Sequence, residues 1–258
     1  MTIVECFHEA ECQAAALQAY ERFSVSANWP IPELFCSYAA SRPAFESSTS
    51  RSDALRVFTA EVYENLRRYW MVFRSSSTGQ YWPSERVFDS LKDNFADLGW
   101  NTNITLANVP TIISAQEMVL RLEALRDIKP NKGYPIMAAS KFLHFFNPRL
   151  FPIYDNEIVW ERVMKLFRND FKTYCISAGL PYDMTDSAVF LRNYIWWASS
   201  LVAGAHPEFM SVFSRWAEEN SNEILSPNDL SLLYATAFEF AVIGAERIEN
   251  ARLAPVRP

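Results

Sequence analysis

The chain has 258 residues, of which 50% are hydrophobic and 21% charged, and its formal net charge is −6. This much apolar material can form the core of one large domain, or of one domain with a smaller lobe, and it excludes disorder over most of the chain. The negative charge argues against a surface that binds phosphate all round, and the six glycines are too few for a typical large β-sandwich or nucleotide-binding α/β fold.

The N-terminal part of the chain shows apolar residues at helical spacing. Spacings of three and four over residues 3–23 predict an amphipathic helix. A connector rich in serine and proline follows over residues 24–52. Further apolar stripes predict one helix through residues 55–73 and another through residues 87–98, with Gly99 as the C-cap of the second.

The pattern changes in the middle of the chain. Residues 100–113 are rich in β-branched side chains, which indicates a short strand or an extended loop. Ser114 and Glu117 have the spacing of a capping box, which predicts the start of a helix that ends at Lys129. Later helices are expected over residues 135–146, 155–169, 186–203, 207–220 and 228–247.

These patterns together predict an all-α fold of about nine helices with little or no sheet. We expect residues 1–52, the N-terminal helix and the connector, to form an arm or a small lobe. Residues 53–250 should form the main helical domain and residues 251–258 a mobile tail.

Cysteine usage and hydropathy bear on the cellular compartment. The four cysteines contain no Cys-x-x-Cys pair, and the first residues lack the basic and apolar regions of a secretory signal. We therefore expect free thiols and a cytoplasmic location. The two most apolar segments, residues 188–203 and 230–245, are shorter than the roughly 20 residues that a bilayer span needs. They should be core helices, and no membrane partner is expected.

Residues 133–155, with the sequence GYPIMAASKFLHFFNPRLFPIYD, are the most informative segment. On a helix, Met137, Lys141 and His144 share one face. The other faces are aromatic and aliphatic, so most of this helix should be buried. Lys141 and His144 must then either extend to solvent or line a cleft.

Basic residues gather in and around this segment without any acidic neighbour between positions 129 and 149, which predicts a local positive patch. The candidate ligand- or phosphate-binding side chains are Lys129, Lys132, Lys141, His144 and Arg149. Asp155 then precedes the next predicted helix. Its carboxylate could act as a general base or stabilise a cation, or it could be an ordinary N-cap.

The run from Ala139 to Asp155 resembles a signature shared by uncharacterised bacterial helical proteins, roughly Ser-Lys-x-Leu-His-Phe-x-x-Pro-x-Leu-Phe-Pro-x-x-Asp. More distantly, it resembles the core of the helix-hairpin-helix DNA glycosylases. That resemblance implies that Asp155 takes the place of the catalytic aspartate and that Gly133 lies in the hairpin. Met137 stands at the position of the catalytic lysine, with Lys141 one helical turn later. The resemblance therefore implies a monofunctional glycosylase, because lyase chemistry needs an amine that forms a Schiff base.

Two further features have alternative interpretations. An aromatic run that includes Trp196 and Trp197 lies on a helix that is apolar nearly all round, which is typical of a core; stacking on a base is the alternative. Glu239 lies among apolar residues. It is either a partly buried acid with a raised pKa or, as is more common, an outward-facing residue or the partner of an arginine.

Two functional hypotheses follow. The first is a non-catalytic cytoplasmic helical protein that binds a ligand or a macromolecular partner in a groove beside Lys141, His144 and Asp155. The alternative is a DNA glycosylase-like enzyme in which Asp155 is the catalytic carboxylate and the basic side chains contact phosphates. We expect no cofactor and no metal in either case, and the partner to be a nucleic acid or another protein.

Overall fold

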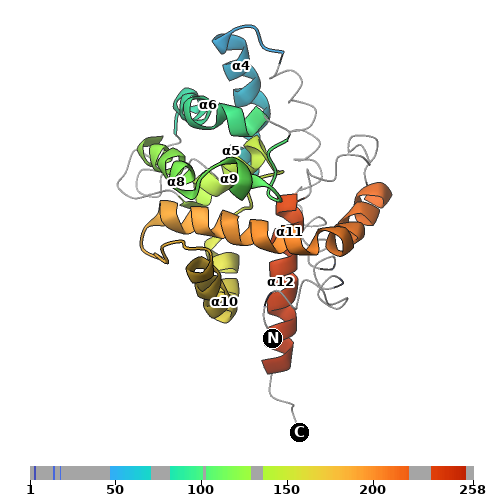
Figure 1. The fold of residues 1–258 in the computed structure, drawn as a ribbon. Coiled ribbons are helices and arrows are strands. Elements are labelled where there is room, and N and C mark those ends of the chain that lie inside the picture. The colour runs from blue at the N-terminus through green and yellow to red at the C-terminus, as the bar shows by residue number, and fades with distance from the viewer. Residues whose placement is uncertain are drawn as a thin grey trace.

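The computed structural model describes residues 3, 14, 18, 47–70, 82–100, 103–128, 136–220 and 234–253. These residues are mostly helical and contain no strand, which confirms the predicted all-α fold (Figure 1). The elements in chain order are α4 (Arg51–Val57), η1 (Phe58–Tyr63), α5 (Glu64–Trp70), α6 (Ser84–Trp100), α7 (Val109–Ile112), α8 (Ala115–Ala124), η2 (Leu125–Ile128), α9 (Ile136–Phe146), η3 (Asn156–Val163), α10 (Met164–Ser177), α11 (Ser187–Asn220) and α12 (Tyr234–Leu253).

Most of the predicted N-terminal helix and most of the connector lie outside the described residues. Ile3 is helical and fully buried, and its backbone N–H donates to Asp170 Oδ2 over 2.7 Å. The end of the connector is described: Ser50 caps α4 by accepting the N–H of Asp53, so this helix begins at Arg51.

The stripe predicted through residues 55–73 forms α4, η1 and α5 without a break up to Trp70. Its apolar side rests on α6, where the rings of Phe58 and Phe88 lie 5.5 Å apart. The second predicted stripe is α6. This helix continues through Gly99 to Trp100, so the prediction of Gly99 as a C-cap is wrong.

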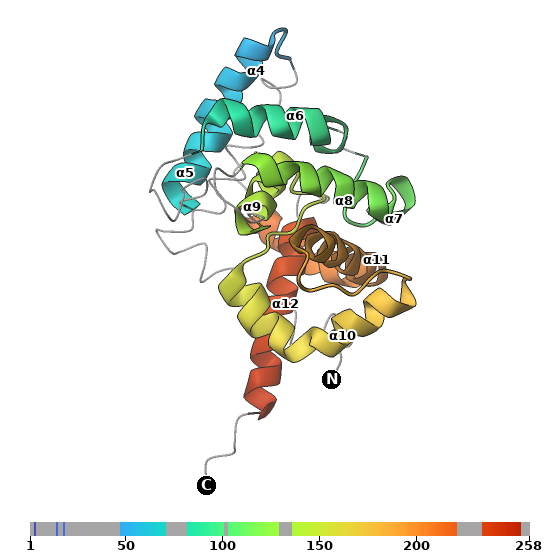
Figure 2. The same ribbon diagram turned by 90° about the vertical axis from the view of Figure 1, so that its left-hand side faces the viewer.

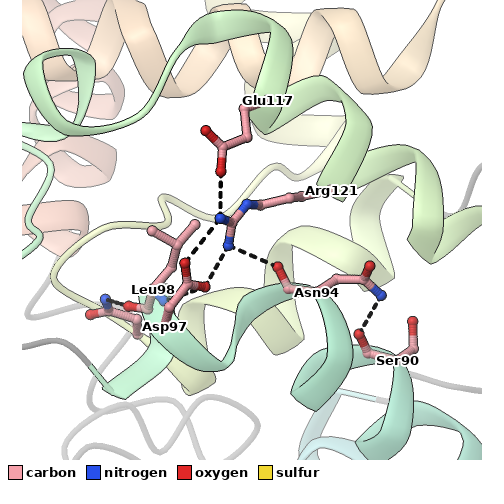
Figure 3. A network of polar contacts seen from close by, with 7 residues as sticks. Ser90, Asn94, Asp97, Leu98, Glu117 and Arg121 are labelled. Atoms are coloured by element: carbon pink, nitrogen blue, oxygen red, sulfur yellow. Dashed lines mark hydrogen bonds and ion pairs between the residues drawn. The ribbon is translucent and has the colours of Figure 1, made fainter.

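A guanidinium clamp joins α6 to α8 (Figure 3). Arg121 of α8 donates to Asp97 Oδ2 over 2.9 Å and to the carbonyl of Asn94 over 3.1 Å, and it also pairs with Glu117. The hydrogen bonds from Arg121 lower the pKa of the Asp97 carboxyl. The predicted helix start at Ser114 is confirmed, because the Ser114 side chain accepts the N–H of Glu117 over 3.1 Å, while the Glu117 carboxylate pairs with Arg121.

The prediction of a strand or extended loop over residues 100–113 is only partly right. The described part contains turns and then the short helix α7. The Asn108 side chain accepts the N–H of Thr105 over 2.8 Å and donates to the Asn103 carbonyl over 2.7 Å, and this local bonding competes with extended structure. Pro110 then lies in the first turn of α7, where a missing N–H has no cost.

Helix α11 forms the centre of the domain and contacts α7, α8, α9, α10 and α12. Its buried aromatic residues include Trp196 and Trp197, which confirms the core interpretation of this run. The prediction of separate helices over 186–203 and 207–220 is wrong, because α11 is assigned continuously with Pro207 inside it. Among the described residues, no helix combines the length and the apolar character that a membrane span requires.

Candidate functional site

The predicted signature forms helix α9 followed by the return segment, which we define as residues 147–155. This segment has turns but no helix or strand, and most of it is buried. Its peptide groups therefore have no regular ladder of partners, and a buried peptide group without a partner is destabilising. Side chains from α9 and α12 supply several of these partners.

Asn147 anchors the beginning of the return segment. Its Nδ2 donates to the carbonyl of Leu98 over 2.6 Å, and its Oδ1 accepts the N–H of Arg149 over 3.1 Å. The carbonyl of Arg149 in turn accepts the N–H of Leu106 over 2.7 Å. These bonds join the segment to the end of α6 and to the turns before α7.

Two side chains of α9 bind the rest of the segment, and the side chain earlier in α9 binds the residue later in the segment. His144 Nδ1 lies 2.8 Å from the carbonyl of Phe151, so this nitrogen carries the proton. Ser140 Oγ accepts the N–H of Tyr154 over 2.9 Å and lies 3.1 Å from the carbonyl of the same residue. Burial lowers the pKa of His144 to about 4, and the ring is therefore neutral at physiological pH.

Glu239 reaches the same segment from α12. Its Oε1 accepts the N–H of Ile153 and lies 3.5 Å from His144 Nδ1. Only 15% of the Glu239 side chain is exposed, and burial raises the pKa of its carboxyl well above the ordinary value. Of the two interpretations of Glu239, the partly buried acid is confirmed and the outward-facing residue is wrong, and no arginine among the described residues forms an ion pair with it.

Lys141 and Asp155 form the outer edge of this polar group. Lys141 Nζ lies 3.6 Å from Asp155 Oδ2, and their side chains are 13% and 24% exposed. The carbonyl of Asp155 accepts the N–H groups of Val159 and Trp160, so η3 begins directly after this residue. The pair therefore places an ammonium of α9 beside a carboxylate at the start of the next helix.

Two tyrosines lie beneath this edge. The rings of Tyr154 and Tyr194 are 6.2 Å apart in an edge-to-face arrangement, and both are buried. The Tyr194 hydroxyl makes no hydrogen bond among the described residues. Its pKa is raised well above the ordinary value, first by burial and then by the charges of Glu239, Tyr154 and Asp155. The buried hydroxyl thus lies within the electrostatic reach of both carboxyl groups.

The predicted site residues have different surroundings. Lys141 and Asp155 meet at a partly exposed position, whereas His144 and Arg149 are only 3% and 4% exposed. Lys129 and Lys132 lie outside the described residues. Sequence reasoning did not single out Asn147, and the only local signal for it was the Asn-Pro pair that often starts a turn. The described residues contain no group of three His, Cys, Asp or Glu side chains that could hold a metal ion.

Comparison of the chain with protein-family models, with characterised proteins and with solved structures finds no match.

Replacing Ser140 with alanine should destabilise the fold. Ser140→Ala leaves the buried N–H of Tyr154 without its acceptor, and an unsatisfied buried group of this kind costs about 1–3 kcal/mol. Ser177→Ala is the matched control, since its hydroxyl bonds the Tyr174 carbonyl of its own helix at an exposed position and should change stability by less than about 0.5 kcal/mol. Urea unfolding measures the stability of both variants, and equal effects would contradict a stabilising bond between Ser140 and Tyr154.

Glu239→Gln should change how stability depends on pH. The native carboxyl keeps its proton well above the ordinary pKa of 4.5, whereas the unfolded carboxyl loses it there. Between about pH 5 and 7 the native wild type therefore binds more protons than the unfolded chain does. The free energy of unfolding consequently falls as pH rises, and this group contributes at most about 1.4 kcal/mol per pH unit.

Because the amide does not titrate, the variant should gain stability relative to wild type over that range, as measured by urea unfolding at each pH. The contribution of His144 is common to both proteins and largely cancels in the difference. Glu161→Gln, at an exposed position, corrects for the lost negative charge. Parallel curves for Glu239→Gln and wild type would contradict a neutral native carboxyl.

Proposed function

We propose that the protein is a non-catalytic helical binding protein that takes up a ligand or a macromolecular partner at the Lys141–Asp155 pair. One observation supports this proposal: the pair is partly exposed, while the backbone that carries Asp155 is held by Ser140 and Glu239. Charges that are fixed before binding lose little conformational freedom when a ligand arrives.

The distance within the pair indicates the chemistry of the ligand. At 3.6 Å the ammonium and the carboxylate are farther apart than in a direct hydrogen bond of about 2.7–3.2 Å. A ligand with an acceptor and a donor side by side could bond to Lys141 and to Asp155 at once. Amides and nucleobases have this arrangement, and His144 supports the site from beneath through the return segment.

The first test is thermal unfolding of the full chain with free nucleobases and with amino-acid amides. A probe at about 100 times its Kd should stabilise the native state by about 2.7 kcal/mol, and each kcal/mol raises Tm by roughly 2–4 °C in a chain of this size. Lys141→Gln and Asp155→Asn should each abolish the shift. Lys92→Gln, an exposed position on α6, should retain it. A shift that survives in both site variants would refute binding at this pair.

A second function, a glycosylase-like enzyme, is favoured by the position of Asp155. The residue directly precedes η3 after the Phe-Pro-Ile-Tyr run, which is where the resemblance to the helix-hairpin-helix glycosylases puts a catalytic aspartate. An ionised Asp155 would stabilise the oxocarbenium-like sugar as the base departs, and water would then add to C1′. Met137, which is 44% exposed, has no amine for a Schiff base, so the product would be an intact abasic site.

The glycosylase candidate is tested with duplex DNA that contains alkylated, deaminated or oxidised bases, with strand breaks measured after alkali treatment. Wild type should produce breaks only after alkali, since it leaves the abasic strand intact. Asp155→Asn should lose at least about 100-fold in rate, because it removes the charge that supports the transition state. Asp93→Asn, an exposed substitution on α6, should keep full activity. Equal rates for the two variants would exclude a catalytic role for Asp155.

A further inference from the structure

Trp160 is an exposed aromatic residue in the first turn of η3, directly after the Lys141–Asp155 pair in the fold. Its side chain remains accessible, since the residue is 37% exposed, whereas the other tryptophans whose side chains the structure describes are buried. A single exposed apolar residue needs no explanation by itself. The position of Trp160 relative to the pair is what makes it informative.

The wide first turn of η3 brings Trp160 towards the side of the helix on which Asp155 lies. The carbonyl of Asp155 accepts the N–H of Val159 over 2.8 Å and that of Trp160 over 3.3 Å. The second bond joins residues five apart, as in a π-helix. At about 100° per residue, an α-helix would turn Trp160 roughly 140° away from Asp155. A turn that closes in five residues instead places Trp160 one turn beyond Asp155 on nearly the same side.

One buried ring holds both Trp160 and the backbone before Asp155. The indole of Trp160 packs edge-to-face on Phe190, with ring centroids 5.5 Å apart. The same Phe190 ring packs edge-to-face on Tyr154 over 5.3 Å, and Tyr154 immediately precedes Asp155. Phe190 itself is 2% exposed. The indole and the carboxylate are therefore supported by the same part of the core, which limits their movement relative to each other.

Met137 supplies apolar surface beside the other member of the pair. It lies four residues before Lys141 on α9, so the two side chains share one face, and it is 44% exposed. Its thioether is polarisable and makes favourable contacts with aromatic rings. Exposed apolar side chains thus accompany the two charged groups on both α9 and η3. Sites for small ligands have this composition, in which a few polar groups orient a ligand on a mainly apolar surface.

We propose that Trp160 stacks on the bound ligand, and that the site takes a planar heterocycle of the nucleobase type rather than an open-chain amide. This inference rests on the function proposed for the Lys141–Asp155 pair and names its ligand class. The ring carbonyl accepts a hydrogen bond from Lys141, and the neighbouring ring N–H donates one to Asp155. Both bonds lie in the plane of the ring, while stacking acts on its face, so one pose satisfies all three contacts.

The test compares uracil with dihydrouracil by isothermal titration calorimetry on the full chain. The two compounds have the same carbonyl and N–H edge, but dihydrouracil has lost the aromatic face. Wild type should bind uracil about 5- to 150-fold more tightly, as expected for one base stacked on an aromatic side chain. Trp160→Leu should bind the two compounds equally, because only the affinity for uracil falls. Trp160→Phe keeps a smaller ring and should show an intermediate preference.

Two further variants separate stacking from hydrogen bonding. Lys141→Gln should weaken both compounds, because both use the same polar edge. Leu120→Ala removes a side chain that is 64% exposed on α8, and it should leave the preference for uracil unchanged. Equal affinity of wild type for the two compounds would overturn the inference, and this comparison needs no variant to fold. A preference for uracil that survives in Trp160→Leu would also overturn it.

Failure of this inference is distinguishable from failure of the proposed function. If wild type binds an amino-acid amide but neither uracil nor dihydrouracil, the choice of a heterocycle is refuted and the Lys141–Asp155 site stands. If wild type binds none of the three probes, the proposed site is refuted, and the stacking role of Trp160 is refuted with it.

Discussion

The burial of an irregular segment is the constraint on which the candidate site depends. Residues 147–155 cross the interior without helix or strand, so side chains must supply partners for the peptide groups that the few backbone bonds of the turns leave over. Asn147 closes the first turn, His144 takes the carbonyl of Phe151, and Ser140 binds both polar groups of Tyr154. Most polar side chains of the signature therefore serve to bind the backbone of this segment.

The same constraint determines which groups carry charge. An ionised carboxylate or imidazolium in this interior would lose its hydration, so burial raises the pKa of Glu239 well above its ordinary value and lowers the pKa of His144 to about 4. The Lys141–Asp155 pair lies at the outer edge, where part of each side chain still reaches water. The site is therefore layered, with neutral polar groups that hold the backbone inside and a charge pair outside.

Apolar periodicity predicted the elements whose structure depends on one face of a helix. Helix α9 and the buried run on α11 were found in this way, and the spacing of Ser114 and Glu117 located the start of α8. Helical spacing also put Lys141 and His144 on one face, but it could not show that His144 would bond to Phe151 and be buried.

The remaining differences from the sequence-based predictions lie where contacts other than apolar periodicity determine the structure. Ile153 and Glu239 are 86 positions apart, so no local pattern could show that this acid accepts a backbone N–H. The prediction over residues 100–113 was only partly right, because in the described part side-chain bonds of Asn108 replace the extended structure that β-branched residues favour. Pro207 suited the first position of a helix, but the backbone continues as α11 through this residue.

Asp155 is connected to the second half of α10 through one stretch of helix. Asp155 precedes η3, which continues into α10, and Figure 2 shows this ribbon changing direction in α10, where Phe167 leaves helical geometry with φ −107° and ψ 19°. Arg162 on η3 pairs with Glu246, so α12 braces the stretch before the bend. Beyond the bend, Arg168 donates to the Tyr182 hydroxyl. The carboxylate of the Lys141–Asp155 pair therefore lies at the start of a helix that core packing and an ion pair hold in place.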